Sequence, residues 1–173
     1  MRKLSHQEIV ERQNTRNQEP VIPLTVVCVN IRSLHNVGSI FRTADGAGVE
    51  KIWLCGITGC PPHPGICKIA LGAEERVPWE YHTDALVVVR QLKQAGYQVV
   101  LLEQTDVSVE YHRFEPLGPV ALVVGNEIDG LDEDLVPLAD VAVDIYMAGI
   151  KNSLNVGVAF GVVAYHLRTR LKS

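Results

Sequence analysis

Residues 145–160, with the sequence IYMAGIKNSLNVGVAF, place several polar side chains between a predicted strand and a predicted helix. Lys151, Asn152, Ser153 and Asn155 are crowded into this junction. Amides and a hydroxyl group need hydrogen-bond partners where a buried strand meets a buried helix, because an unpaired polar group there costs about 1–3 kcal/mol. A bound ligand is one candidate partner for these side chains.

Two other segments repeat this arrangement of a strand end followed by polar residues and glycine. Residues 35–48 (HNVGSIFRTADGAG) follow a predicted strand over 24–29, and residues 122–131 (LVVGNEIDGL) contain the end of another strand, over 119–124. Ligands of open α/β sheets bind beyond the carboxyl ends of the strands. The three junctions therefore predict one composite site.

A phosphate-binding loop is not indicated at any of these junctions. No G-x-G-x-x-G pattern follows a predicted strand, and no Walker A pattern occurs in the sequence. The stretch Gly125–Gly130 carries Glu127 and Asp129 where a phosphate would lie. Because acids repel phosphate, a neutral or cationic ligand fits this stretch better.

The elements that must position these junctions alternate along the chain. Short, apolar, β-branched runs predict strands, and amphipathic stretches between them predict helices. The pattern predicts an α/β domain with a mainly parallel sheet and helices on both faces. The predicted strands cover 24–29, 51–55, 97–102, 119–124 and 141–145, and the predicted helices cover 36–47, 68–73, 84–94, 132–138 and 153–170.

Local signals divide the chain into a short extension and one domain. Residues 1–20 are predicted to form a helical extension, because Ser5 and Glu8 have the spacing of a capping box. Residues 21–173 are long enough for one domain with a full core. Within this domain, Asn36 is predicted to cap a helix, and residues 56–66 are predicted to form a glycine- and proline-rich loop.

The last predicted helix is apolar on almost every side from Leu154 to Tyr165. A helix of this kind is buried on several sides. Gly157 and Gly161 lie one turn apart, which predicts the close approach of another helix. We expect a homodimer through this C-terminal helix, and the alternative is burial wholly within one chain.

Composition excludes several classes of protein. The chain has 47% hydrophobic residues and a net charge of −4, so any nucleic-acid partner requires local basic patches, such as Arg32, His35 and Arg42. No apolar run reaches the ~20 residues that span a bilayer, and the N-terminus lacks the apolar segment of a secretory signal, so no membrane association and a cytoplasmic location are expected. Cys60, His63 and Cys67 lack the regular spacing of a structural zinc site, so no metal is predicted.

Three motifs, in this order, resemble those of the SpoU/TrmH branch of the SPOUT methyltransferases. The first is N-x-G-x-x-x-R-T-A-x-x-x-G from Asn36 to Gly48, the second is V-V-G-N-E-x-x-G-L over Val123–Leu131, and the third is S-L-N-V-x-V-A over Ser153–Ala159. Residues 68–73 (KIALGA) are similar to a further stretch of the family. The resemblance covers roughly residues 24–170.

The resemblance implies an enzyme that transfers a methyl group from S-adenosylmethionine to a ribose 2′-hydroxyl of RNA. It also implies a C-terminal deep trefoil knot around the cofactor pocket, and a homodimer. Transfer RNA is favoured over ribosomal RNA, because the short N-terminal extension is similar to the layout of the transfer-RNA members. The alternatives are a ribosomal-RNA methyltransferase, a dimeric RNA-binding module without turnover, and a methyltransferase of this fold that acts on a base or a protein.

The resemblance also assigns roles to individual residues. Arg42 either stabilises a developing alkoxide or clamps a phosphate, because an arginine is almost always charged and is a poor free base. Asn36 orients Arg42 or the substrate, and Glu127 holds a polar group near the reacting sugar. Ser153 and Asn155 fix the hinge and the substrate ribose. Purely structural roles remain the alternative, as helix caps for Asn36, Ser153 and Asn155, as an ion pair with Asp45 for Arg42, and as a solvated turn acid for Glu127.

The cofactor is expected to contact the second and third motifs, largely through the backbone. The expected cofactor-binding residues are Val124, Gly125, Asn126, Ile145, Tyr146, Met147, Ser153 and Leu154. Tyr146 departs from the family, which often has proline at this position, so its ring is expected to alter the wall of the adenine pocket. Whether Arg42 serves the site of its own subunit or that of the partner stays open.

Overall fold

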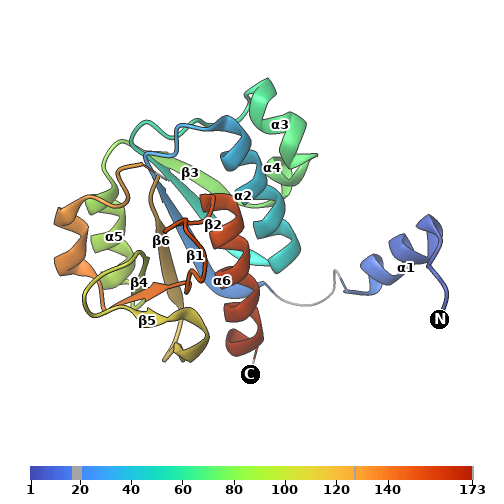
Figure 1. Ribbon diagram of the computed structural model, residues 1–173. Coiled ribbons are helices and arrows are strands. Elements are labelled where there is room, and N and C mark those ends of the chain that lie inside the picture. Colours follow the sequence, from blue (N-terminus) through green and yellow to red (C-terminus); the bar gives the residue numbers. More distant parts are fainter. Residues whose placement is uncertain (17–20, 127, 173) are drawn as a thin grey trace.

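The computed structural model describes residues 1–16, 21–126 and 128–172. Its sheet has seven strands in the order β3-β2-β1-β6-β4-β7-β5, and every neighbouring pair is parallel (Figure 1). The strands are β1 (Ile22–Val29), β2 (Val49–Cys55), β3 (Trp79–His82), β4 (Gln98–Leu102), β5 (Val109–Glu110), β6 (Val120–Val124) and β7 (Val141–Asp144). The predicted α/β fold is therefore confirmed, with a sheet that is parallel throughout.

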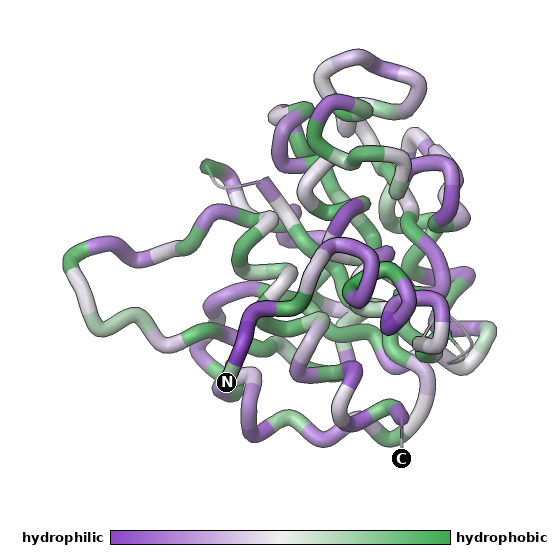
Figure 2. The backbone as a smooth tube through the Cα atoms, turned by 90° about the vertical axis from the view of Figure 1, so that its right-hand side faces the viewer, coloured by the Kyte–Doolittle hydropathy of each residue, from purple (hydrophilic) through white to green (hydrophobic). Residues whose placement is uncertain are grey.

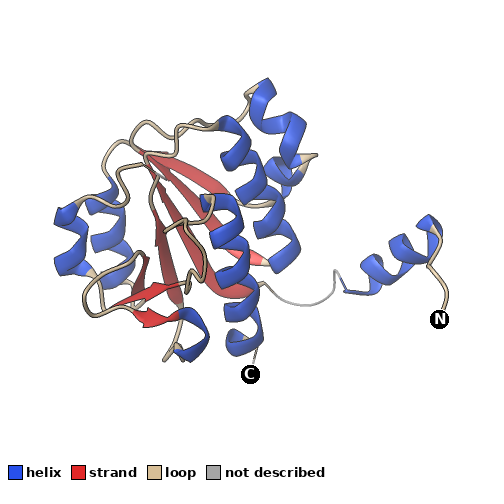
Figure 3. Ribbon diagram, in the orientation of Figure 1, coloured by secondary structure: helices blue, strands red, loops and turns tan. Residues whose placement is uncertain are grey.

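Helices cover both faces of this sheet (Figure 3). The helices are α1 (His6–Arg16), α2 (Leu34–Ala47), α3 (Pro64–Ala70), α4 (Ala73–Arg76), α5 (Ala85–Gln94) and α6 (Val156–Leu171), with 3₁₀ turns η1 (Tyr111–Arg113) and η2 (Glu133–Leu138). Residues of α2, α3, α4 and α6 share one hydrophobic cluster with the sheet, and residues of α5 and η2 share the other. None of the described helices is both long and apolar enough to cross a membrane.

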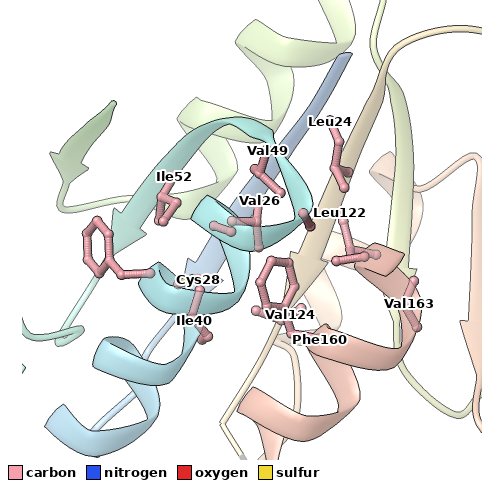
Figure 4. Close-up of a cluster of buried hydrophobic side chains, with 14 of the residues drawn as sticks. Leu24, Val26, Cys28, Ile40, Val49, Ile52, Leu122, Val124, Phe160 and Val163 are labelled. Carbon is pink, nitrogen blue, oxygen red and sulfur yellow. The ribbon is translucent and has the colours of Figure 1, made fainter. Parts of the chain in front are cut away.

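The central strands are buried on both sides, which explains why their sequences are continuously apolar. In β1, Val26 and Cys28 join the cluster on the α2 and α6 side, whereas Val27 and Val29 join the cluster on the α5 side. Figure 4 shows Phe160 of α6 among the side chains of β1 and β6. Helix α6 is therefore part of the core of its own chain.

Several helix starts differ from the sequence prediction. Ser33, and not Asn36, caps α2, because the Ser33 side chain accepts a hydrogen bond from the Asn36 backbone N–H. Helix α3 begins at Pro64 and is capped by His63, within the stretch predicted as loop. Helix α6 begins at Val156, because Asn155 is its cap. At the starts of α2 and α6 several strong capping residues lie close together, and local sequence does not rank them; at α3 the cap is a histidine, which is not a typical capping residue.

Two edge strands and one helix type were also missed. The side chains of β3 are half-buried or exposed, and β5 has only 2 residues, so neither strand carries a buried apolar run. The segment predicted as a short helix over 132–138 is the 3₁₀ turn η2. By contrast, the capping box of α1 is confirmed, since Ser5 N donates to Glu8 Oε2 (2.8 Å) and Glu8 N donates to Ser5 Oγ (3.3 Å). Helix α1 is predominantly hydrophilic (Figure 2).

The two small residues of α6 serve contact with α2 of the same chain. A Cβ atom added at Gly157 would lie 3.2 Å from Ser39 Cβ, and one added at Gly161 would lie 3.6 Å from Thr43 Cγ2. The close helix approach predicted from these glycines is thus intramolecular. Val158 and Tyr165 of α6 remain more than half exposed, so part of its apolar surface is uncovered in the single chain.

Gly38 of α2 offers a test of the close packing between α2 and α3. A Cβ atom at Gly38 would lie 2.7 Å from the Ile66 carbonyl oxygen, which belongs to the backbone and cannot rotate away. We expect Gly38→Ala to lower the free energy of unfolding, because overpacking costs about 1–3 kcal/mol and the helix-propensity gain is at most about 1 kcal/mol. Urea unfolding measures the change.

Gly46→Ala is the matched control in the same helix. Its Cβ atom would meet the Tyr165 hydroxyl at 2.7 Å, at the far end of a side chain that can rotate. We expect Gly46→Ala to be at least as stable as the wild type, because it gains helix propensity without a backbone clash. Equal unfolding midpoints for the two variants would contradict this account of Gly38.

Candidate functional site

A pocket of about 400 Å³ opens at the carboxyl ends of β4, β6 and β7. This volume lies within the range of small-molecule sites. Its walls come from the segments that follow these strands and from the first turn of α6. The lining residues are Leu102, Glu103, Gln104, Val124, Gly125, Asn126, Ile128, Asp129, Gly130, Leu131, Val143, Asp144, Ile145, Met147, Asn152, Ser153, Leu154, Val156 and Ala159.

The structure brings together the residues expected to contact a cofactor, with one exception. Val124, Gly125, Asn126, Ile145, Met147, Ser153 and Leu154 all line the pocket. Tyr146 does not, and 74% of its surface is exposed. It lines an adjoining hollow of about 430 Å³ together with Ile150 and Lys151. The ring of Tyr146 thus points away from the pocket, between two neighbours that face it.

A tight turn forms the wall of the pocket beyond β6. Asn126 is 8% exposed, and its Oδ1 accepts hydrogen bonds from the backbone N–H groups of Ile128 (3.0 Å) and Asp129 (2.9 Å). A Cβ atom at Gly125 would lie 2.4 Å from the Gly130 carbonyl oxygen, so only glycine permits this closure. Glu127 lies outside the described residues, and its expected role stays a prediction.

Sequence reasoning missed the contribution of β4. Glu103 follows this strand, and its carboxylate accepts from the backbone N–H groups of Gln104 (2.9 Å) and Leu131 (3.2 Å). Gln104 Nε2 in turn donates to the Asn152 carbonyl oxygen at 2.5 Å. The segment after β4 therefore holds the other two walls in place. The rule that ligands bind beyond carboxyl ends could have found it, because residues 97–102 were predicted as a strand.

Asn155 joins the first motif to the third. Its Nδ2 donates to Asn36 Oδ1 at 2.9 Å, and its Oδ1 accepts from the Gly157 backbone N–H at 3.1 Å. Asn36 is only 5% exposed, whereas Asn155 is exposed, so this contact lies at the edge of the core. One side chain thus caps α6 and fixes the start of that helix against the first turn of α2.

Arg42 is exposed on α2 and does not line the pocket. It lies six residues after Asn36, which places it about 240° further around the helix. Within residues 1–16, 21–126 and 128–172, Arg42 has no ion-pair or hydrogen-bond partner. Asp45, the partner considered from the sequence, instead lies 3.6 Å from Arg76 Nε. Arg42 is therefore available to a group outside its own chain.

The stretch that carries Cys60, His63 and Cys67 runs from a loop into α3 and has a structural role in the described part of the chain. His63 Nδ1 accepts from the Gly65 backbone N–H at 3.1 Å and caps α3. Burial raises the pKa of the Cys60 thiol, and a hydrogen bond with the Glu74 carboxylate raises the pKa of the Cys67 thiol. Both shifts disfavour the thiolate that metals bind. The described residues contain no group of three or more potential metal ligands.

The parallel sheet and a pocket beyond its carboxyl ends, lined by residues of the second and third motifs, define an α/β protein with the site geometry of a small-molecule binder. Comparison with family models identifies the family of this protein. The model of the SpoU rRNA Methylase family matches residues 23–165, and the chain belongs to this family.

Individual relatives act on two kinds of RNA, by their names. The chain is 33% identical over 143 residues to the 23S rRNA (guanosine-2′-O-)-methyltransferase RlmB of Ralstonia nicotianae, which covers 83% of this chain and 57% of the relative. It is 31% identical over 159 residues to the tRNA (guanosine(18)-2′-O)-methyltransferase of Thermus thermophilus, covering 91% of this chain and 80% of that enzyme.

A solved structure shares the fold over most of the chain. The AdoMet-bound rRNA methyltransferase from Sinorhizobium meliloti superposes with a TM-score of 0.81 at 31% sequence identity, covering 91% of this chain and 60% of that one. The chain thus spans little more than half the length of these ribosomal-RNA relatives.

The two hydrogen bonds of Asn155 can be separated by substitution. We expect Asn155→Ala to lower the free energy of unfolding by about 1 kcal/mol, because it removes the cap of α6. Asn155→Asp keeps the accepting oxygen and adds a charge that the helix N-terminus favours, but it removes the amide donor to Asn36. Thermal unfolding should therefore separate the two variants, with Asn155→Asp less destabilised than Asn155→Ala, because it loses the bond to Asn36 but keeps the cap. Equal losses would show that the cap contributes nothing.

Proposed function

We propose that this protein transfers the methyl group of S-adenosylmethionine to a ribose 2′-hydroxyl of RNA. The observation that carries the proposal is the pocket at the carboxyl ends of β4, β6 and β7. It gathers residues of the second and third motifs, and Asn155 connects it to the first. Membership of the SpoU rRNA Methylase family, and relatives named as 2′-O-methyltransferases, support it.

The residues of the pocket fit S-adenosylmethionine. Apolar side chains such as Val124, Ile145 and Leu154 suit a flat adenine ring, and the carboxylates of Asp129 and Asp144 suit a ligand with a sulfonium and an ammonium group. When bound, the cofactor supplies an activated methyl group. The residues that would hold it are the expected ones that line the pocket, joined by Leu102 and Gln104 from the end of β4.

The residues of the chain would prepare the ribose hydroxyl for attack. An arginine is not a free base at neutral pH, so Arg42 would stabilise the developing alkoxide or clamp the neighbouring phosphate with its planar fork. Asn36 and Asn155, which are hydrogen-bonded to each other, would orient the reacting groups. Ser153, which is exposed at the pocket, would contact the ribose, and Glu127 would hold a polar group beside it.

We propose a homodimer in which α6 forms the interface. The uncovered side chains Val158 and Tyr165 lie seven positions apart and thus on one face of the helix. The position of Arg42 outside the pocket of its own chain supports a shared site, in which Arg42 would serve the partner's pocket. The deep trefoil knot stays a prediction of the same resemblance.

Transfer RNA is the favoured substrate. The transfer-RNA methyltransferase of Thermus thermophilus aligns with 91% of this chain and the 23S rRNA relative with 83%, so more of the residues of this chain have a counterpart in the former. A cytoplasmic location is proposed because RNA of both kinds is found there.

A transfer assay tests both the activity and Arg42. Purified protein is incubated with radiolabelled S-adenosylmethionine and either total transfer RNA or ribosomal RNA. We expect label in transfer RNA with the wild type and a loss of at least about a hundredfold in rate with Arg42→Ala, because an electrostatic stabiliser of this kind contributes roughly that much. Digestion to nucleosides should place the methyl group on ribose.

Two controls make this result specific. Cofactor affinity should stay within a few-fold of wild type in Arg42→Ala, because Arg42 does not line the pocket. Arg42→Lys keeps the charge but not the fork, so recovery of activity would indicate charge alone. A wild-type rate in Arg42→Ala would overturn its role, and RNA binding without transfer to either RNA would favour the non-catalytic module.

Gly125→Ala tests whether this pocket is the cofactor site. Its new Cβ atom would lie 2.4 Å from the Gly130 carbonyl oxygen and displace the turn that forms one wall. We expect calorimetric titration to show a loss of cofactor affinity of at least about tenfold, since a fixed pocket wall that shifts loses several contacts at once. Gly149→Ala is the matched control, because a Cβ atom there meets nothing within 4 Å. Unchanged cofactor affinity in both variants would show that this pocket is not the cofactor site.

A further inference from the structure

An ion pair crosses the mouth of the site between the loop after β1 and the turn after β6. Arg32 Nη2 lies 3.4 Å from Asp129 Oδ2, and the two residues are 97 positions apart in the chain. Both side chains are 61% exposed. Asp129 also lines the pocket, whereas Arg32 does not. The ion pair therefore lies at the solvent-exposed edge of the pocket.

This pair is weak by geometry and by environment. Charge-assisted hydrogen bonds of arginine are normally about 2.7–2.9 Å long and often bidentate, whereas this contact is longer and is made through Nη2. Exposed ion pairs contribute only about 0–1 kcal/mol. A phosphate that offers two oxygens to the same guanidinium is a stronger partner than this carboxylate. Arg32 can thus exchange Asp129 for a phosphate at little cost.

The surroundings of Arg32 favour an anion. Arg32 directly precedes Ser33, the cap of α2, and the first turn of that 14-residue helix contains no acidic residue. The N-terminus of a helix carries partial positive charge and attracts anions. His35, in the same turn, is exposed. A phosphate that reached Arg32 would therefore also face the positive end of α2.

The acidic side chains of the pocket would repel RNA unless a nearby cation offset their charge. Asp129, Glu103 and Asp144 line the pocket, and an RNA chain that approaches them would be repelled. Glu103 and Asp144 already accept hydrogen bonds from Leu131 N and Ser108 Oγ, respectively. The Asp129 carboxylate faces Arg32. Arg32 is thus placed to offset the charge nearest the mouth.

We propose that Arg32 binds a phosphate of the RNA substrate next to the target nucleotide, and that Asp129 holds its guanidinium at the mouth of the pocket until that phosphate replaces the carboxylate. This inference rests on the proposed function, because it assigns a residue to recognition of the RNA. Arg32 is a substrate-binding residue in this scheme, and Asp129 is the residue that positions it. Asp129 lowers the affinity for RNA, since it competes for the same guanidinium.

RNA binding without cofactor tests the exchange directly. Filter binding with total transfer RNA is measured at several salt concentrations for the wild type, Arg32→Ala and Asp129→Asn. We expect Arg32→Ala to bind several-fold more weakly and to reduce the slope of log affinity against log salt by about 1, the value for one lost phosphate contact. Asp129→Asn should bind RNA more tightly than the wild type, because Arg32 loses its competitor.

Arg90→Ala is the matched control. Arg90 is an exposed arginine of α5, on the opposite face of the sheet from α2 and α6 (Figure 1). Its removal changes the net charge by the same amount as the removal of Arg32, but on that opposite face. We expect the RNA affinity and salt slope of Arg90→Ala to equal those of the wild type. Arg32→Ala should also bind the cofactor as the wild type does, since Arg32 does not line the pocket. This unchanged affinity would show that the fold of the variant is intact.

The outcomes separate this inference from the proposed function. Suppose that the wild type binds and methylates RNA. If Arg32→Ala then has the same RNA affinity and salt slope as Arg90→Ala, the role of Arg32 is overturned and the proposed function is not. Weaker RNA binding by Asp129→Asn would overturn the competition. A wild-type protein that binds neither transfer RNA nor ribosomal RNA would overturn the proposed function, and this inference with it.

Discussion

Parallel pairing of every strand is the constraint on which the site depends. Because β4, β6 and β7 are neighbours and run in one direction, the segments that follow them emerge at the same edge of the sheet. Backbone groups at that edge have no further strand partners, so polar side chains and tight turns must satisfy them. The same groups that complete the backbone hydrogen bonds therefore form the walls of the pocket.

Side chains that tie distant segments together give this edge a fixed shape. Glu103 connects the end of β4 to the turn after β6, and Gln104 connects it to Asn152. Asn155 connects the start of α6 to Asn36 in the first turn of α2. The bond between Asn155 and Asn36 joins the third motif to the first, and the two bonds from the end of β4 join that segment to the second motif and to the residue before the third. The ion pair of Arg32 and Asp129 is the exposed counterpart of these ties.

Helix α6 combines two demands. Its inner side completes the core through Phe160 and approaches α2 closely at Gly157 and Gly161. Its outer side still carries apolar side chains at Val158 and Tyr165. Three features of the single chain are consistent with the proposed second subunit. Arg42 is exposed on α2, the pocket of its own chain lacks this arginine, and α6 has an uncovered apolar face.

The sequence by itself determined the fold class and the central strands, because apolar runs that alternate with amphipathic stretches are local signals. It also predicted that residues such as Val124, Ile145 and Leu154 would come together beyond the carboxyl ends of the strands, as they do. Only the tertiary structure decided the strand order, the edge strands β3 and β5, and the orientation of Tyr146 away from the pocket. It alone revealed the contacts of Glu103, Asn155 and Arg32, because each joins residues whose separation in the chain is bridged by sheet order rather than by local periodicity.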